Sequence, residues 1–507
     1  MMSNLPGNTL PDTATLLVSG GDTRIGLDPA SGMSMYGCRP QPERDLLALG
    51  SCTASQISDA GFAAAGSLRL RCVEQLRYRS HAAVYADQVA RLRSELLACC
   101  GLSPFDGVGV VLGASGSDLF LLAAQWIRPH RTVMIAPGET GSGLPAALQG
   151  RHFNDRAGTV TPGAPVSDWA GEIVALAARA ADGSLRAPAA IDADCAASVA
   201  AAAGAGRRVL LVLTDVSKTG LILPGIDTAL AQKRKYPAQV EVLVDACQFR
   251  MAPATLRAYL AQDCMVALTG SKFVGGPTFC GALLVPPACA ARYAGATLNA
   301  GVDSYSNASD WPSDWGAGHS LPATGNFGLL LRWAAAMAEL RPFLALPASR
   351  SAAFARRFGQ VVRTRLSQDA CFEALPVAPL SRQALGPGLA GGWDSEQSIF
   401  PFLIHAPDQA GGRRPLRRDE TQRLYHALRS AGRRRYQLGQ PVACGVRDGV
   451  AVSALRLCLG ARMLVAAAAP AGSEKVLADA LAALDEIARL VNHFLPAAPP
   501  APAQAMR

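Results

Sequence analysis

Short apolar runs that end in turn residues recur through the middle of this 507-residue sequence and constrain its fold more than any other feature. The runs are GVGVVLG, TVMIAPG, RRVLLVLTD, VEVLVDAC and CMVALTGSK, and helical patterns alternate with them. Strands that are buried on both faces have such continuous apolar sequences. A sixth run, CGALLVP, lies close behind the fifth and predicts a hairpin-like pairing at that edge. We therefore predict an α/β fold with a large domain, in which a mostly parallel, seven-stranded-type sheet lies between helices.

Flanking segments predict the rest of the organisation. Residues 1–45 are rich in Gly, Pro, Ser and Asp and predict an irregular N-terminal arm that packs on a partner subunit. Residues 46–335 form the large domain, beginning with helices between 59 and 100. Residues 336–495 predict a connecting helix and a smaller C-terminal α/β domain. The Pro- and Ala-rich residues 496–507 predict a disordered tail.

Composition limits the partners of the chain. The net charge of +9 comes mostly from scattered arginines, with clusters at residues 413–418 and 433–435 that lack interleaved aromatic residues. We therefore expect no nucleic-acid partner; each cluster is either a solvated face or an attractor for anionic substrates. The 13 cysteines are dispersed and odd in number, which favours free thiols in a reducing cytoplasm. The sequence has neither a signal peptide nor an apolar run of membrane-spanning length, so we expect no membrane association.

Polar residues at the predicted strand ends are the candidate site, because ligands of parallel sheets bind at the carboxyl ends of the strands. The sequence GASGSD follows the first strand and precedes a helix. Its backbone amides and the hydroxyls of Ser115 and Ser117, with Gly116 between them, suit a phosphate. A simple turn with a helix cap has the same sequence.

Asp245 and Gln248 follow a strand that is too apolar to be exposed. A buried carboxylate requires a cationic partner, and a protonated pyridine nitrogen is one such partner. Asp245 could instead cap the helix that begins near Pro253.

Two cationic side chains also lie in apolar surroundings. Lys272 is preceded by a hydrophobic strand and small hydroxyl residues, which hold its amine in a desolvated and nucleophilic position; only Lys218 shares this setting. Arg456 is a lone charge in the apolar strand SALRLCLG. It requires an anion, either a substrate carboxylate or a core Asp or Glu.

In this order, these residues resemble the fold type I transferases that depend on pyridoxal 5'-phosphate (PLP), and most closely the class V aminotransferase and cysteine desulfurase group. The resemblance covers motifs over residues 113–460. It implies that Ser115, Gly116 and Ser117 receive the phosphate, and that Lys272 forms a Schiff base with the cofactor. It further implies that Asp245 contacts the pyridine nitrogen and that Arg456 binds the substrate's α-carboxylate.

The resemblance implies further contacts and an assembly. Gln248 would contact the phenolic oxygen, and Thr269 the phosphate. Thr324 would reach the phosphate of the neighbouring subunit, which implies a homodimer with a shared active site. The remaining cofactor contacts that the resemblance implies are Thr140, Ser217 and Ser271. No metal is expected.

Three departures from the group bear on the reaction. Thr140 follows Glu139 where desulfurases place a ring-stacking histidine, and their usual Asn is replaced near Ser217. The Ser-rich loop with a persulfide-forming cysteine is not recognisable, and Cys444 is the nearest substitute. These differences count against desulfuration. The roles of residues 139–153, including His152, stay open.

We expect a PLP-dependent enzyme that acts on an amino acid or related amine through an external aldimine and an α-carbanion, with Lys272 as the general base. Transamination is the favoured reaction. β/γ-Elimination or replacement is the alternative, and decarboxylation is a third. A non-catalytic binding protein with the same fold, or a PLP-free protein with a buried lysine, also stays open. The sequence identifies no substrate.

Overall fold

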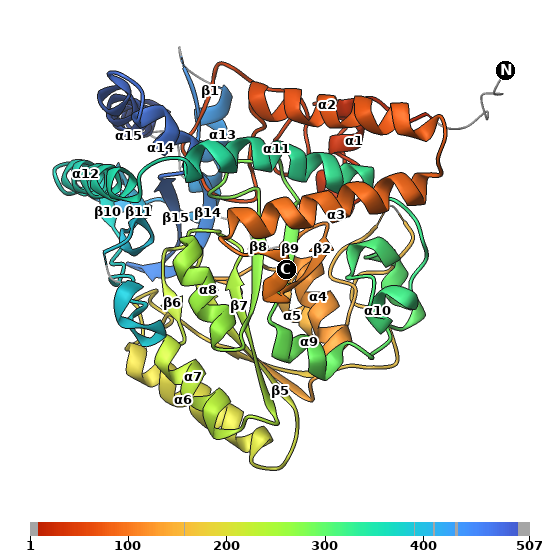
Figure 1. The fold of residues 1–507 in the computed structure, drawn as a ribbon. Helices are drawn as coiled ribbons and strands as arrows, with labels where there is room; N and C mark the ends of the chain where they lie inside the picture. The colour runs from red at the N-terminus through yellow and green to blue at the C-terminus, as the bar shows by residue number, and fades with distance from the viewer. Residues whose placement is uncertain (1–8, 157, 390, 409–410, 431–433, 495–507) are drawn as a thin grey trace, which may run out of the picture.

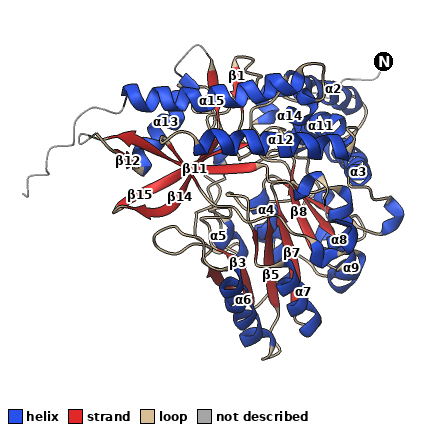
Figure 2. Ribbon diagram, turned by 90° about the vertical axis from the view of Figure 1, so that its left-hand side faces the viewer, coloured by secondary structure: helices blue, strands red, loops and turns tan. Residues whose placement is uncertain are grey.

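Two sheets with their covering helices form the molecule in the computed structural model (Figures 1 and 2). The structure describes residues 9–494 except 157, 390, 409–410 and 431–433. The predicted disordered tail, residues 496–507, lies outside the described residues. No helix in the described part of the chain is long and apolar enough to cross a membrane.

The larger sheet has the order β2-β9-β8-β7-β5-β3-β4, with β6 added beside β5. Its strands are β2 (Gly109–Gly113), β3 (Arg131–Ile135), β4 (Glu172–Leu176), β5 (Val209–Asp215), β6 (Ile222–Leu223), β7 (Val240–Ala246), β8 (Met265–Thr269) and β9 (Gly281–Val285). Strands β4, β3, β5, β7 and β8 are parallel, and β9 is antiparallel to both β8 and β2. The predicted α/β class with a mostly parallel sheet is confirmed.

Two details of the sheet differ from the prediction. Strand β9 pairs with β8 as expected, but it lies inside the sheet because β2 covers its other side. Strand β4 was not expected at all. Its sequence EIVAL is exposed or half-buried over four of five residues, so it lacks the continuous apolar pattern of the inner strands.

Alternate residues of the inner strands enter two separate cores. In β5, for example, Leu211 and Leu213 belong to one core, whereas Leu210 and Val212 belong to the other. Both faces are therefore buried, which explains the unbroken apolar runs. The helices of this domain are α2 (Asp59–Leu76), α3 (His81–Cys99), α4 (Gly116–Ile127), α5 (Leu144–Leu148), α6 (Pro188–Ala203), α7 (Ile226–Lys235), α8 (Pro253–Ala261), α9 (Pro287–Tyr293), α10 (Gly316–His319) and α11 (Phe327–Leu344).

The smaller sheet has the order β10-β11-β15-β14, with β12 beside β11, and Figure 2 shows helices packed above it. Its strands are β10 (Phe372–Ala374), β11 (Ile399–Pro407), β12 (Arg413–Pro415), β14 (Gly439–Arg447) and β15 (Val450–Cys458). The helices that accompany it are α12 (Ala348–Ser367), α13 (Arg418–Ser430), α14 (Ala461–Ala467) and α15 (Gly472–Phe494). The predicted smaller C-terminal α/β domain is confirmed as a fold feature.

The N-terminal segment packs against other parts of its own chain. It contains the short helix α1 (Thr13–Leu17), and the fully buried Arg332 of α11 donates hydrogen bonds to the carbonyls of Leu17, Ser19 and Gly20. Farther along, β1 (Leu46–Ala48) pairs with β13 (Arg435–Gln437), so the boundary region near residue 46 contacts the C-terminal part of the chain. The expected packing of this arm on a partner subunit stays a prediction.

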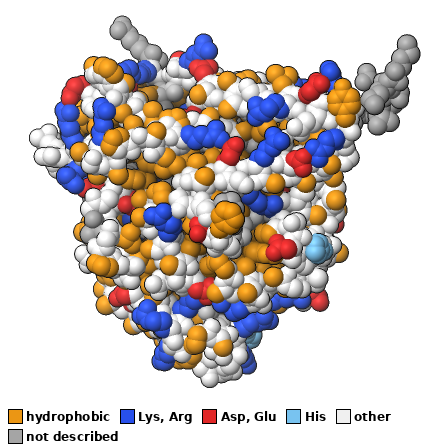
Figure 3. Space-filling model, in the orientation of Figure 1, with side chains coloured by type: hydrophobic (Ala, Val, Ile, Leu, Met, Phe, Trp, Pro, Cys, Tyr) orange, Lys and Arg blue, Asp and Glu red, His pale blue; other side chains and the backbone are white. Residues whose placement is uncertain are grey.

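Described arginines of both clusters pair with acidic side chains, whereas Arg433 lies outside the described residues. Arg414 pairs with Glu420, and Arg435 pairs with Asp45. On the face in Figure 3, basic side chains are scattered between acidic and hydrophobic ones. Their described partners favour the interpretation of these clusters as solvated, ion-paired faces.

Candidate active site

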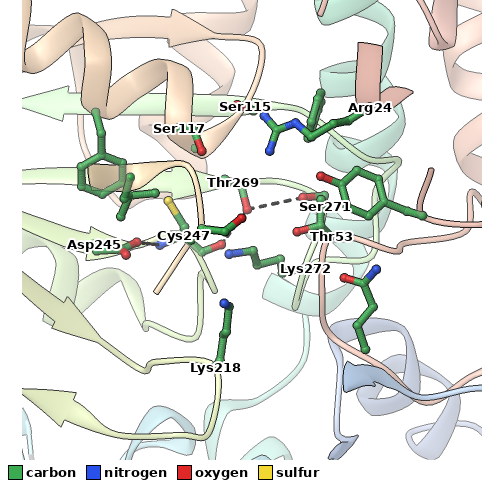
Figure 4. Close-up of a pocket in the computed structure, with 18 residues that line it drawn as sticks. Arg24, Thr53, Ser115, Ser117, Lys218, Asp245, Cys247, Thr269, Ser271 and Lys272 are labelled. Carbon is green, nitrogen blue, oxygen red and sulfur yellow. Dashed lines mark hydrogen bonds between the residues drawn. The ribbon is translucent and has the colours of Figure 1, made fainter. Parts of the chain in front are cut away.

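A cavity of about 180 Å³ lies at the carboxyl ends of the central strands of the large sheet (Figure 4). A smaller cavity of about 90 Å³ adjoins it. Both are lined by Lys218, Asp245, Lys272 and Gln440, so they are two parts of one space. Its position is the one at which parallel sheets bind ligands.

Asp245 enters this space from the end of β7. Its side chain is buried, and the backbone amide of Cys247 donates to its Oδ1 at 3.2 Å. It has no ion-pair partner among the described residues. The sequence predicted either a cationic partner or a helix-capping role for this carboxylate. Helix α8 begins at Pro253 with Ala252 as its N-cap, so Asp245 does not cap it.

Lys272 lies three residues beyond the end of β8, in a tightly packed loop. The amide of Gly270 donates to the Cys280 carbonyl at 2.9 Å, and a Cβ at Gly270 would lie 2.6 Å from the side chain of Ala336. This packing fixes the loop and directs the Lys272 amine into the cavity (Figure 4). The amine has no hydrogen-bond partner within the described structure. It is thus positioned to react with a ligand.

The N-terminus of α4 forms one wall of the cavity. Ser115 is the N-cap of this helix. Its hydroxyl accepts a hydrogen bond from the amide of Asp118 and donates one to the Asp118 carboxylate. Arg156 pairs with the same carboxylate at 2.8 Å. The Ser115 hydroxyl is therefore already engaged, whereas the Ser117 hydroxyl has no described partner. Gly116 lines the wall where a Cβ would lie 3.0 Å from the sulfur of Cys247.

Thr269 and Ser271 lie opposite this helix. The Thr269 hydroxyl donates to the Cys247 carbonyl at 2.6 Å, and the Ser271 hydroxyl lies 3.5 Å from the Thr269 hydroxyl. Both side chains line the larger cavity together with Ser115, Gly116 and Ser117. Backbone amides at a helix N-terminus with nearby hydroxyls form a favourable environment for a phosphate.

Thr140 and Ser217 line the smaller cavity, but other groups hold their hydroxyls. Thr140 donates to the Ile135 carbonyl at 3.0 Å, and Ser217 donates to Glu139 at 2.6 Å. The same carboxylate pairs with Arg179. These contacts fix the segment after β5, where Val216 has a φ of +64°, a strained value for a β-branched residue.

Arg456 on β15 is buried and contacts two carbonyls rather than a carboxylate. It donates to the carbonyl of Lys218 at 3.2 Å and to that of Gln440 at 2.7 Å. Its Nε has no hydrogen-bond partner although it is buried. The alternative of a core Asp or Glu partner is not observed among the described residues, so the charge faces the cavity without a counterion.

Of the remaining residues, Gln248 lines the cavity, whereas Thr324 and His152 lie outside it. Gln248 lines the smaller cavity, where its Oε1 accepts from Ser51 at 3.3 Å. Thr324 is exposed and does not line either cavity, and its predicted role in a neighbouring subunit stays a prediction. His152 lies within 2.8 Å of the Tyr305 hydroxyl and stacks on that ring, so it is a structural residue.

Three side chains that line the cavity had no role predicted from the sequence. Arg24 comes from the N-terminal arm, where it pairs with Asp22 and lies over the ring of Phe279. Gln440 comes from β14, and Lys218 enters from the turn after β5. Only Lys218 carried a signal in the sequence, which was its apolar setting.

Cys444 is a poor candidate for sulfur transfer. It is 1% exposed and packs among apolar side chains of β14, β15 and β11. Burial raises the pKa of its thiol, so the thiolate is disfavoured. It does not line either cavity.

Comparison with solved structures places this arrangement within one fold. The chain has the fold of the fold type I PLP-dependent enzymes, as the sequence predicted. Cysteine desulfurase CsdA from Escherichia coli is 14% identical, with 88% of this chain and 96% of that chain covered and a TM-score of 0.52.

Two structures of the cystine C-S lyase C-DES are similar to the same degree. Its complex with cysteine persulfide is 14% identical, with a TM-score of 0.51 over 86% of this chain and 97% of that one. A variant with glycine covalently linked to its PLP cofactor is 15% identical, with a TM-score of 0.51 over 84% and 93%. No family model and no curated protein matches the sequence.

The donor set of the cavity fits PLP. An unpartnered amine, a buried carboxylate without a cation, and a helix N-terminus with a free hydroxyl face one space. These three groups suit an aldehyde, a pyridine nitrogen and a phosphate, respectively.

Proposed function

We propose that this chain is a PLP-dependent enzyme that acts on an amino acid or a related amine. The observation that carries the proposal is the placement of Lys272 and Asp245 in one cavity, both without a charged partner among the described side chains. Lys272 would hold the cofactor covalently, and Ser117 with the amides of α4 would hold its phosphate. Bound PLP supplies an electron sink for negative charge at the substrate's α-carbon.

Side chains that line the cavity would bind the substrate and transfer its proton. Arg456, which lines the cavity without a counterion among the described side chains, would bind the substrate's α-carboxylate and so orient the α-carbon. The Lys272 amine would remove the proton from the α-carbon and hold it for the proton return that transamination requires. Asp245 would keep a proton on the pyridine nitrogen of PLP. The segment held by Glu139 closes one side of the cavity.

Transamination is the reaction that we favour, because no described thiol in the larger part of the cavity is activated. The only thiol lining the larger part is Cys247, and burial raises its pKa well above the ordinary value. The second candidate is β/γ-elimination or replacement, which the likeness to a C-S lyase favours. Buried Cys444 argues against a desulfurase that carries a persulfide on this residue.

We further propose a homodimer in which Thr324 serves the neighbouring site, because this residue is exposed and remote from its own cavity. A reducing cytoplasm suits the chain, since all 13 cysteines are free.

Reductive trapping tests the proposal. The purified protein is loaded with PLP, reduced with borohydride and digested, and the modified lysine is identified by mass spectrometry. We expect the label on Lys272, and its loss in Lys272→Ala but not in the matched variant Lys218→Ala. Label on neither lysine, with no visible absorption band after loading, overturns the proposal. Incubation with amino acids then separates the two reactions, since transamination releases a 2-oxo acid without loss of a side-chain group.

A further inference from the structure

The substrate side of the cavity contains two cations that no acidic side chain neutralises. Four basic side chains line the two parts of the cavity: Arg24, Lys218, Lys272 and Arg456. Arg24 is paired with Asp22, and the proposed function assigns Lys272 to the cofactor. Lys218 and Arg456 are left without an ion-pair partner in the described part of the chain.

Carbonyl oxygens hold both cations in place without neutralising them. The Lys218 amine donates to the Pro137 carbonyl at 2.9 Å, and Arg456 donates to the carbonyls of Lys218 and Gln440. Such contacts satisfy hydrogen bonds but leave a full positive charge on each side chain. An anion that enters this space would therefore gain from both charges.

The only carboxylates that line the cavity are otherwise engaged or lie at the cofactor. Glu139 accepts from Arg179, Ser217 and Thr219. Asp245 is assigned to the cofactor. Neither is therefore available as a counterion for Lys218 or Arg456.

The geometry separates the two charges. Arg456 contacts the backbone of Lys218, whereas the Lys218 amine lies at the far end of its own side chain, against the loop after β3. Figure 4 shows this side chain extended toward Lys272. The guanidinium and the amine are thus held by different carbonyls and are two separate anchors.

The backbone holds Lys218 rigidly at this position. Its amide donates to the Glu139 carbonyl at 2.9 Å, and the flanking Ser217 and Thr219 donate to the Glu139 carboxylate. Two residues before it, Val216 has the strained φ of +64°. A surface lysine would need no such support, so the chain presents this side chain to the cavity at a cost in backbone strain.

We infer that Lys218 determines substrate specificity, and that the substrate is an amino acid or 2-oxo acid with a second acidic group. The inference rests on the proposed function. In it, Arg456 binds the α-carboxylate and Lys218 binds the distal carboxylate or phosphate. A substrate with an apolar side chain would leave the Lys218 charge buried without a counterion, which disfavours its binding.

Burial, together with the charges of Arg456 and Lys272, lowers the pKa of Lys218 to about 8. The facing carboxylates of Glu139 and Asp245 oppose this shift only in part. An acidic ligand would reverse it.

Binding of substrate-like acids tests the inference. Glutarate, 3-phosphonopropionate and butyrate are titrated into the PLP-loaded protein at pH 7 and followed by calorimetry. We expect one or both of the diacids to bind about 10- to 100-fold more tightly than butyrate, as a hydrogen-bonded charge pair implies. The stronger of the two diacids distinguishes a distal carboxylate from a distal phosphate.

Variants assign the effect to Lys218. Lys218→Met should abolish the preference for diacids while butyrate binding is kept, and Lys218→Arg should restore part of it. Lys235→Met, which removes an exposed lysine of α7, is the matched control and should change nothing. Equal affinity for glutarate, phosphonopropionate and butyrate in the wild type overturns the inference. So does a loss of butyrate and diacid binding by the same factor in Lys218→Met.

The outcome of these titrations can be distinguished from the outcome of the PLP-trapping experiment. If trapping shows no PLP on Lys272 but the diacid preference persists, the proposed function fails while the two-cation site stands as an acid-binding site.

Discussion

Asp245 and Lys272 reach the same cavity from neighbouring parallel strands. Asp245 lies beside Ala267 in the register of β7 and β8, and Lys272 follows three residues after β8 ends. The sheet fixes Asp245, and the tightly packed loop after β8 fixes Lys272, so their separation does not depend on a flexible segment. Such rigidity is what a site needs to hold a cofactor by two points.

Asp245→Asn tests the charge at this position. The substitution keeps the shape of the side chain and removes its negative charge. A proton on the pyridine nitrogen of PLP would then no longer be stabilised. We expect turnover to fall by about 100-fold or more, since the electron sink is weakened. Steady-state kinetics measures the effect, and the exposed Asp227→Asn serves as control. Turnover within a factor of two of the wild type would contradict the role of Asp245.

Dependence on pH tests the state of Lys218. An acidic ligand favours the protonated amine, so the pKa of Lys218 must rise when the ligand binds. The affinity for a diacid is therefore constant below pH 8 and falls as the pH rises above the free pKa of about 8. Calorimetric titrations between pH 6 and 10 should show this decline in the wild type. In Lys218→Met the decline should disappear, and a decline of unchanged size in that variant would assign the titration to another group.

Cys444→Ala tests for a persulfide on this residue. The thiol is buried, and burial raises its pKa, so we expect the variant to keep turnover within about twofold and to lose little stability. Activity assays and urea unfolding measure both. Iodoacetamide should leave Cys444 unmodified in the native protein, as mass spectrometry of the digested product reports. A large loss of turnover with unchanged stability would instead support a reaction in which Cys444 carries a persulfide.

Arg332→Met tests the attachment of the N-terminal arm. The substitution leaves the carbonyls of Phe279, Leu17 and Ser19 without their buried donor. We expect the free energy of unfolding to fall by about 3 kcal/mol or more, because each unsatisfied carbonyl costs roughly 1–3 kcal/mol.

Urea unfolding and limited proteolysis near Ser19 check this expectation. Arg357→Met is the control: that side chain is half exposed and pairs with Glu474, so its loss should cost only about 0.5 kcal/mol. If Arg332→Met is as stable as the control and its arm is equally resistant to protease, the arm is held by other contacts.

The strand ends of the large sheet were predictable because their physical signal is local. Continuous apolar runs gave β5, β7 and β8, and the polar residues that follow them, Asp245 and Lys272, lie in one cavity. Strand β4 was missed because it lies at the edge of the sheet, where half-buried residues need no continuous apolar pattern.

The remaining parts of the site depend on contacts between distant segments. Nothing in the local sequence shows that Arg24 and Gln440 meet at the same cavity, since they are brought there by the packing of the arm and by the pairing of β14 with β15. The partners of two hydroxyl residues could not be predicted for the same reason. Thr140 and Ser217 are donors to Ile135 and Glu139, and such competing partners become visible only in three dimensions.

The attachment of the arm to Arg332 has a consequence for biosynthesis. More than 300 residues separate Leu17, Ser19 and Gly20 from the arginine that holds them. At ribosomal speeds, these three residues wait on the order of tens of seconds before Arg332 has been synthesised. Arg24 belongs to the same arm, so the nascent chain completes this wall of the cavity late. During that interval the unattached arm is accessible to proteases and chaperones.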